Sequence, residues 1–253
     1  MKKKSTNITN KIWSCSAIAV VLIIWQIVCS MQLVENFMLP SPIQVTKTLI
    51  REFPILMEHS IVTLAEAFIG LCFGILLGFV MAVFMDQFEP LYKAFYPLVV
   101  LSQTIPTVAI APLLVLWFGY DMEPKIILIV ITTFFPIAIG LLNGFKSVDQ
   151  DSVHLLQAMG AGRLQIFKHI KLPSAMSQFF AGLRISASYA IVGAVISEWL
   201  GGFSGLGVYM TRVKKAFSFD KMFAVIFLIS SISLLLMKGV DLLQKKCMPW
   251  EKE

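Results

Sequence analysis

One apolar stretch of the chain, residues 61–85, reads IVTLAEAFIGLCFGILLGFVMAVFM, and Glu66 is its only charged residue. A helix needs about 20 mostly apolar residues to cross the hydrocarbon core of a bilayer, so this stretch is long enough to span one. The whole chain agrees, because 57% of its 253 residues are hydrophobic and only 14% are charged. Soluble domains carry roughly a quarter charged residues. The sequence therefore predicts a membrane protein.

Five further apolar stretches surround this one. The six predicted spans cover residues 12–33, 61–85, 94–118, 126–145, 176–200 and 222–243. We expect an all-α, polytopic membrane protein with a single transmembrane domain over 1–253 and a long loop at 146–173. The stretch 12–33 exceeds the roughly 7–15 apolar residues of a signal peptide, which favours a retained first helix.

The basic residues indicate how the spans are oriented. Six spans put both termini on one side, and with the termini inside, twelve of the 21 Lys and Arg residues are cytoplasmic, seven are external and two lie within spans. The positive-inside tendency therefore predicts cytoplasmic termini in a multi-pass cell-membrane protein. The net charge of +6 favours contact with lipid or a protein partner over nucleic acid. The four cysteines are widely spaced, so neither a disulfide framework nor a metal site is predicted.

Small residues form a ridge on the stretch 61–85. Gly70, Gly74 and Gly78 recur every four residues and would let a neighbouring helix approach closely. That neighbour belongs either to this chain or to a second subunit, and the sequence leaves both possibilities open.

Proline and polar residues interrupt the stretch 94–118. Pro106 is one of three prolines there, and each removes a backbone donor and disturbs the helix. Ser102, Gln103 and Thr104 lie just before it. Such a polar, kinked segment is compatible with a transport pathway and equally with a purely structural span.

Ionisable residues inside spans are costly and therefore suggestive of function. Glu66, Arg184 and Glu198 are in this position. Glu198, near the predicted outer boundary, is either an interfacial carboxylate or a cargo contact. Arg184 is either an anchor at the cytoplasmic side or a pathway residue.

The loop 146–173 predicts two short amphipathic helices. Apolar residues recur every third position in two sets, which are Val153, Leu156 and Met159, then Leu164, Phe167 and Ile170. Gly160, Ala161 and Gly162 separate the sets and indicate a sharp turn. Leu172 and Pro173 are expected to end the second helix before the next span.

The same loop carries a family resemblance. Gly160, followed after nine residues by Ile170-Lys171-Leu172-Pro173, resembles the second half of the E-A-A…G…I-x-L-P loop of permease subunits of bacterial ABC importers. The opening differs, because His154-Leu155-Leu156 stands where the family has Glu-Ala-Ala. The resemblance implies that one segment docks on an ATP-hydrolysing subunit. Its residues are Gly160, Ala161, Gly162, Arg163, Ile170, Leu172 and Pro173.

Further motifs narrow the resemblance. The runs LPSP at 39–42, LWFG at 116–119 and AGLR at 181–184 resemble the nitrate, sulfonate and taurine branch. The runs SEWLGG at 197–202 and GLGVYM at 205–210 resemble permeases assigned to hydroxymethylpyrimidine, a thiamine precursor. The resemblance implies an importer permease with a separate ATP-binding subunit, an external binding protein, a second permease copy and no cofactor on this chain. A sulfonate, taurine or nitrate cargo is the alternative.

Other function classes fit less well. The chain has no G-x-x-x-x-G-K-[ST] loop to hold ATP, and its three histidines form no H-E-x-x-H pair, so we expect no enzyme. An ion-coupled transporter would show inverted repeats, which we do not find. If the third and fifth spans face a dimer axis, as the resemblance suggests, polar residues from them would line the cargo route. These residues are Ser102, Gln103, Thr104, Ser186, Tyr189 and Glu198.

Overall fold

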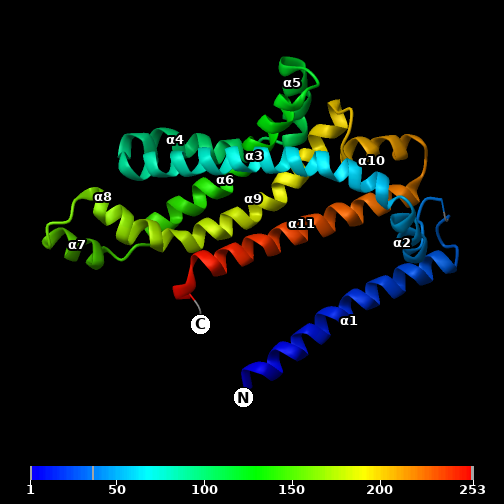
Figure 1. Ribbon diagram of the computed structural model, residues 1–253, viewed down its shortest axis with the longest axis horizontal. Helices are drawn as coiled ribbons and strands as arrows, with labels where there is room; N and C mark the ends of the chain where they lie inside the picture. The colour runs from blue at the N-terminus through cyan, green and yellow to red at the C-terminus, as the bar shows by residue number, and fades with distance from the viewer. Residues whose placement is uncertain (1, 36, 252–253) are drawn as a thin grey trace. The chain divides into compact units, whose positions relative to one another are not determined.

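The computed structural model describes residues 2–35 and 37–251, and every regular element in them is helical (Figure 1). The predicted all-α class is confirmed. The elements are α1 (Lys2–Ser30), α2 (Pro42–Arg51), α3 (Phe53–Gln87), α4 (Glu89–Ser102), α5 (Thr107–Phe118), α6 (Met122–Lys146), α7 (Gln150–Ala158), α8 (Arg163–Ile166), a π-helical turn (Phe167–Lys171), α9 (Leu172–Gly201), α10 (Leu206–Lys215), α11 (Phe219–Cys247) and a short 3₁₀ turn (Pro249–Glu251).

Four helical stretches in the described part are long and apolar enough to cross a membrane. They are Phe53–Gln87, Met122–Lys146, Arg163–Gly201 and Phe219–Cys247. The bent pair α4 and α5 makes a fifth if it counts as one span. The predicted first span, 12–33, falls largely on α1, whose shorter apolar portion is Ser16–Ser30. The sixth span therefore stays a prediction.

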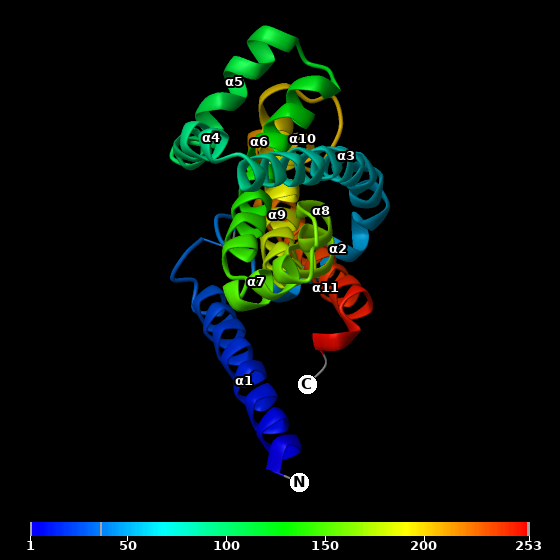
Figure 2. The ribbon, with the colours of Figure 1, turned by 90° about the vertical axis from the view of Figure 1, so that its left-hand side faces the viewer.

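The structure breaks the predicted span 94–118 into two helices. Helices α4 and α5 are bent by 99° at the connection that contains Gln103 and Pro106, a bend that Figure 2 shows. The residue before a proline disfavours helical backbone, and Pro106 itself has no N–H to continue the ladder. Gln103 and Thr104 instead donate backbone hydrogen bonds to the carbonyls three residues back, which closes α4 in a tight turn. The kink expected from the sequence is thus a complete break.

The chain divides into two compact units. The larger unit comprises residues 58–208 and 229–253, and the smaller comprises residues 1–57 and 209–228. Helices α6 and α9 lie side by side at the centre of the larger unit (Figures 1 and 2). Buried apolar residues of these helices dominate its core. They include Ile137, Leu141, Phe145, Phe180, Leu183 and Ala187.

The glycine ridge of α3 packs inside the chain, against α6. A β-carbon added at Gly70 would overlap Ile129, and one at Gly74 would overlap Thr133. Gly78 lies equally close to the backbone of the next turn of α6. The neighbour that approaches the glycine ridge is therefore another helix of the same chain.

Helices α6 and α9 also approach each other closely. Gly182 of α9 lies against the carbonyl of Pro136, and Gly144 of α6 lies against Ala175. Small residues at these crossings bring the two backbones together, a common mode of helix packing in membranes. The central pair therefore positions the residues of both helices with little freedom.

A polar cluster organises the smaller unit. The carboxylate of Glu52, between α2 and α3, lies 3.0 Å from Nζ of Lys221 and accepts a hydrogen bond from the Tyr209 hydroxyl at 3.3 Å. The hydrogen bond from Lys221 holds the pKa of Glu52 below its usual range, whereas burial raises the pKa of Tyr209 to about 12. Thr48 of α2 donates to Asp220 at 2.9 Å, so α2 and the start of α11 are joined by side chains.

Candidate functional site

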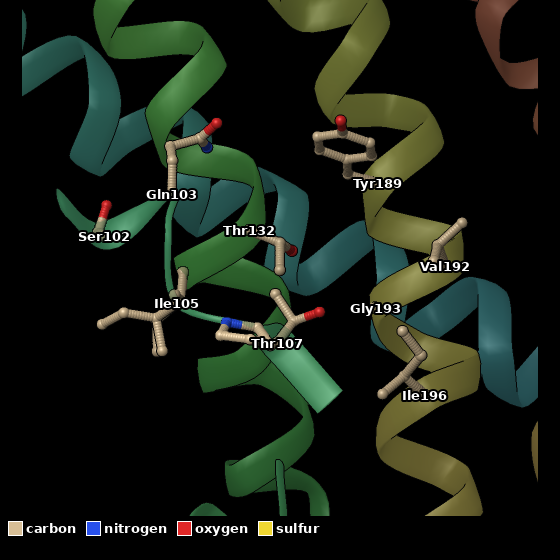
Figure 3. A pocket seen from close by; sticks show the side chains of 11 residues that line it. Ser102, Gln103, Ile105, Thr107, Thr132, Tyr189, Val192, Gly193 and Ile196 are labelled. Atoms are coloured by element: carbon tan, nitrogen blue, oxygen red, sulfur yellow. The ribbon is translucent and has the colours of Figure 1, made fainter. Parts of the chain in front are cut away.

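A cavity of about 320 Å³ lies in the larger unit beside the break between α4 and α5. The broken connection, α6 and α9 supply its walls (Figure 3). The lining residues are Ser102, Gln103, Ile105, Pro106, Thr107, Ile131, Thr132, Tyr189, Val192, Gly193 and Ile196. The volume is at the lower end of the range for small-molecule sites, which is about 300–1,000 Å³.

Five of the lining side chains are polar, and three of them come from three different parts of the fold. Gln103 comes from the broken connection, Thr132 from α6 and Tyr189 from α9, and Figure 3 shows Gln103 and Tyr189 on opposite sides with Thr132 between them. The amide and hydroxyl groups can donate and accept hydrogen bonds, and the ring of Tyr189 offers an aromatic face. Val192 and Ile196 are among the apolar residues of the lining. The cavity suits a small, flat solute with several hydrogen-bonding groups.

The predicted pathway residues have different locations in the structure. Ser102, Gln103 and Tyr189 line the cavity. Thr104 is exposed outside the lining and donates to the carbonyl of Leu101 at 2.8 Å. Two others are buried away from the cavity. Ser186 donates to the carbonyl of Thr133 at 2.6 Å, and Glu198 accepts from Thr63 at 2.7 Å.

Sequence reasoning missed Thr132. The pair Thr132 and Thr133, in an apolar span and just ahead of Pro136, was a usable signal. It could not show which threonine faces the cavity. Thr133 is fully buried against Gly74 of α3, while Thr132 lines the cavity.

The predicted pair of short helices forms a second feature of the larger unit, at the ends of α6 and α9 (Figure 1). Asp149 caps α7, because its carboxylate accepts from the backbone N–H groups of Asp151 and Ser152 and from the Ser152 hydroxyl at 2.7 Å. The Ser152 hydroxyl contributes most to lowering the pKa of Asp149. A charged cap of this kind fixes where the helix begins.

The turn between α7 and α8 has the compactness that its glycines predict. Gly160 has φ +84°, donates to the carbonyl of Gln157, and is followed by Ala161, which donates to Leu156, both at 2.9 Å. This is the Schellman arrangement, in which glycine takes the left-handed position. Gly162 then begins α8, and its N–H is held by the Gln165 side chain at 2.7 Å.

Apolar residues of this helix pair face in two directions. Val148, Val153 and Ile166 are buried together, with Leu156, Ala161 and Ile170 packed beside them. Leu155, Met159 and Leu164 are 61%, 76% and 77% exposed around the turn. Arg163, at the start of α8, is exposed next to them. The turn therefore presents an apolar tip with a basic residue, as a docking element would.

The expected helix end at Leu172 and Pro173 is wrong. The helix continues from Arg163 to Gly201 through the π-helical turn Phe167–Lys171. Pro173 lies in the first turn of α9, directly after this π-helical turn. Lys171, in that turn, pairs with Asp86 of α3 at 2.9 Å. The second short helix is therefore coupled rigidly to α9 rather than hinged to it.

An all-helical membrane protein with a polar cavity at a broken helix and an exposed pair of short helices is, in class, a transport subunit. The chain belongs to the family of binding-protein-dependent transport system inner membrane components, the permease subunits of ABC importers, whose model matches residues 74–248. This membership confirms the resemblance seen in the sequence and a multi-pass location in the inner membrane.

Individual relatives agree with the family. The formylaminopyrimidine transport permease protein of Halalkalibacterium halodurans is 37% identical, with 92% of this chain and 93% of that protein covered. The taurine transport system permease protein of Escherichia coli is 30% identical, with 95% and 90% covered. Among solved structures, the inward-facing MetNI methionine ABC transporter has a TM-score of 0.69 at 19% identity, over 78% of this chain and 97% of that one, which supports the fold.

Proposed function

We propose that this permease carries a pyrimidine-type thiamine precursor through the cavity beside the α4–α5 break. The cavity supports the proposal, because Gln103, Thr132 and Tyr189 combine hydrogen-bonding groups with an aromatic face around about 320 Å³. A planar aminopyrimidine needs both. The relative named for formylaminopyrimidine transport favours the same chemical class.

The permease works as one part of a larger transporter. A separate ATP-binding subunit docks at the tip formed by Leu155, Met159 and Leu164, and an external binding protein delivers the cargo. Two copies of the permease face each other, and this chain binds no cofactor. The exposed apolar tip supports the first contact, because large apolar side chains gathered at a turn mark interaction sites. The family description supports the binding protein.

Uptake of a labelled aminopyrimidine precursor, in cells that carry the complete transporter, tests the cargo. We expect Gln103→Leu and Thr132→Val each to slow uptake several-fold, because each removes a hydrogen-bonding group from the cavity wall. Membrane levels of the permease and basal ATP hydrolysis should be retained. Gln178→Leu is the matched control, because Gln178 is exposed on α9 and lies outside the cavity lining.

Two outcomes would contradict the proposal. Unchanged uptake in both cavity variants would remove the cavity from the route. If deletion of the gene abolished taurine or sulfonate uptake and left precursor uptake intact, the cargo would instead be of the kind named for the taurine relative.

A further inference from the structure

Three ionisable side chains meet in the interior of the larger unit. Glu66 of α3, Lys125 of α6 and Glu198 of α9 are 2%, 6% and 1% exposed. Lys125 Nζ donates to Glu66 Oε1 at 2.6 Å. Lys125 comes just before the predicted span 126–145, but the structure makes it part of α6 and buries it. Buried charges are costly unless they are paired, so the net charge of this cluster should be close to zero.

Glu198 uses both carboxylate oxygens to anchor the start of α10. Oε1 accepts from the Thr63 hydroxyl at 2.7 Å, and Oε2 accepts from the N–H of Gly207 at 2.6 Å. Thr63 in turn accepts from the N–H of Leu206 at 2.9 Å. A β-carbon at Gly205 would overlap the Glu198 carboxyl group, so the connection approaches as closely as glycine allows. Accepting from two donors is the behaviour of an ionised carboxylate.

Glu66 is less well satisfied. Its Oε2 is buried and accepts no hydrogen bond within the described part of the chain, although the Glu66 and Glu198 carboxyl groups are close enough to interact. With both carboxyls ionised, the cluster would hold two negative charges against the single positive charge of Lys125. Among the described residues at the cluster, His59 does not supply a second cation. His59 accepts from the N–H of Gly205 through Nδ1 at 3.0 Å, which leaves no proton on that nitrogen.

Apolar residues of α11 also lie beside the cluster. Ile229, Ile232 and Leu236 of α11 pack around Ala67 and Ala190, beside the cluster. Unmatched charge at a buried site is strongly unfavourable. A proton on Glu66 Oε2 removes that charge and turns the unpartnered oxygen into a donor directed at Glu198.

We propose that this cluster is a binding site for one proton, held between Glu66 and Glu198, and that the proton keeps the α9–α10 connection fastened to α3. The site has a built-in asymmetry. In Glu66→Gln the amide oxygen can still accept from Lys125, while the amide N–H₂ replaces the proton toward Glu198. In Glu198→Gln one of the two acceptors becomes a donor, so either Thr63 or Gly207 loses its partner.

Infrared spectroscopy of the purified transporter tests the site directly, because a protonated carboxyl group has its own C=O stretching band. The difference between wild type and Glu66→Gln should contain one such band at neutral pH, and the wild-type band should vanish on alkalinisation. Absence of the band at neutral pH overturns the proposal. If Glu66→Gln does not accumulate, the pH titration of the wild type alone decides the question in the same way.

Thermal unfolding gives a second readout. The folded state would bind more protons than the unfolded state, so wild-type stability should fall as pH rises from neutral to mildly alkaline. The unfolding midpoint of Glu66→Gln should not follow this fall, and Glu198→Gln should unfold at lower temperature at every pH. Equal pH dependence in wild type and Glu66→Gln contradicts the proposal.

The consequence for transport rests on the proposed function. Uptake by wild type should decline at alkaline external pH, while Glu66→Gln should keep its neutral-pH rate. If neither protein transports the precursor at any pH, the proposed cargo is wrong. The infrared and unfolding experiments do not depend on the cargo and still test the proton site. Identical pH profiles of uptake in two active proteins would count against a role of the proton in transport.

Discussion

Gly160 illustrates how one residue sets the geometry of the turn between α7 and α8. Its φ of +84° is natural for glycine, tolerable for asparagine and strongly disfavoured for a β-branched residue. No atom lies within 4 Å of a β-carbon built at this position, so backbone strain acts there without a steric clash. We expect Gly160→Val to reduce ATP-driven uptake while membrane levels persist, and Gly160→Asn to retain most activity. Equal activity of the two variants would show that the turn conformation is unimportant for coupling.

Asp149 gives a residue-scale prediction for pH. Because its pKa is lowered in the folded state, its cap stabilises α7 above the usual carboxyl range, and this contribution is lost as pH falls through the lowered pKa. Amide hydrogen exchange in α7 should be faster in Asp149→Ala than in wild type at neutral pH, and the difference should shrink in acid. Asp151→Ala, which keeps the Asp149 cap, serves as the control. A difference that persists unchanged in acid would argue against a charged cap.

At the scale of elements, the contact between α6 and α9 determines where the cavity walls lie. A methyl group at Gly182 would strike the Pro136 carbonyl, whereas nothing lies within 4 Å of one at Gly239 on α11. Gly182→Ala should therefore lower the free energy of unfolding by about 1–3 kcal/mol, the usual cost of overpacking. Gly239→Ala should be neutral or stabilising by up to about 1 kcal/mol, from helix propensity. Thermal unfolding in detergent measures both, and equal midpoints would refute the close crossing.

The elements also show what local sequence can specify. Gly160 and Gly162 predicted the turn between α7 and α8, because turn conformation depends on adjacent residues. Pro106 predicted a disturbance between α4 and α5 but not its size. Whether a proline kinks a helix or divides it depends on what satisfies the freed backbone groups, and at Gln103 and Thr104 tight local bonds do so. Similarly, Pro173 was expected to end a helix that in fact continues through a π turn.

For the whole molecule, the distribution of basic residues predicts the orientation in the membrane. Reporter fusions within 87–93 should report a cytoplasmic location, whereas fusions at Asp121 and Ser218 should report the external side. A fusion after Glu253, which lies outside the described residues, should also be cytoplasmic. The basic residues Arg212, Lys214 and Lys215 oppose this trend on α10. A cytoplasmic signal at Ser218 would therefore remove one predicted span and invert the orientation of α10.

The sequence by itself determined the helical membrane class, the pair of short helices on either side of Gly160, and the permease family. These follow from hydropathy over about 20 residues and from turn chemistry over a few, both of which are local. Only the tertiary structure decided that Thr132 rather than Thr133 lines the cavity, and that Lys125 pairs with Glu66, 59 residues away. Those partners depend on which faces of distant helices meet, and helix packing rather than neighbouring sequence fixes that choice.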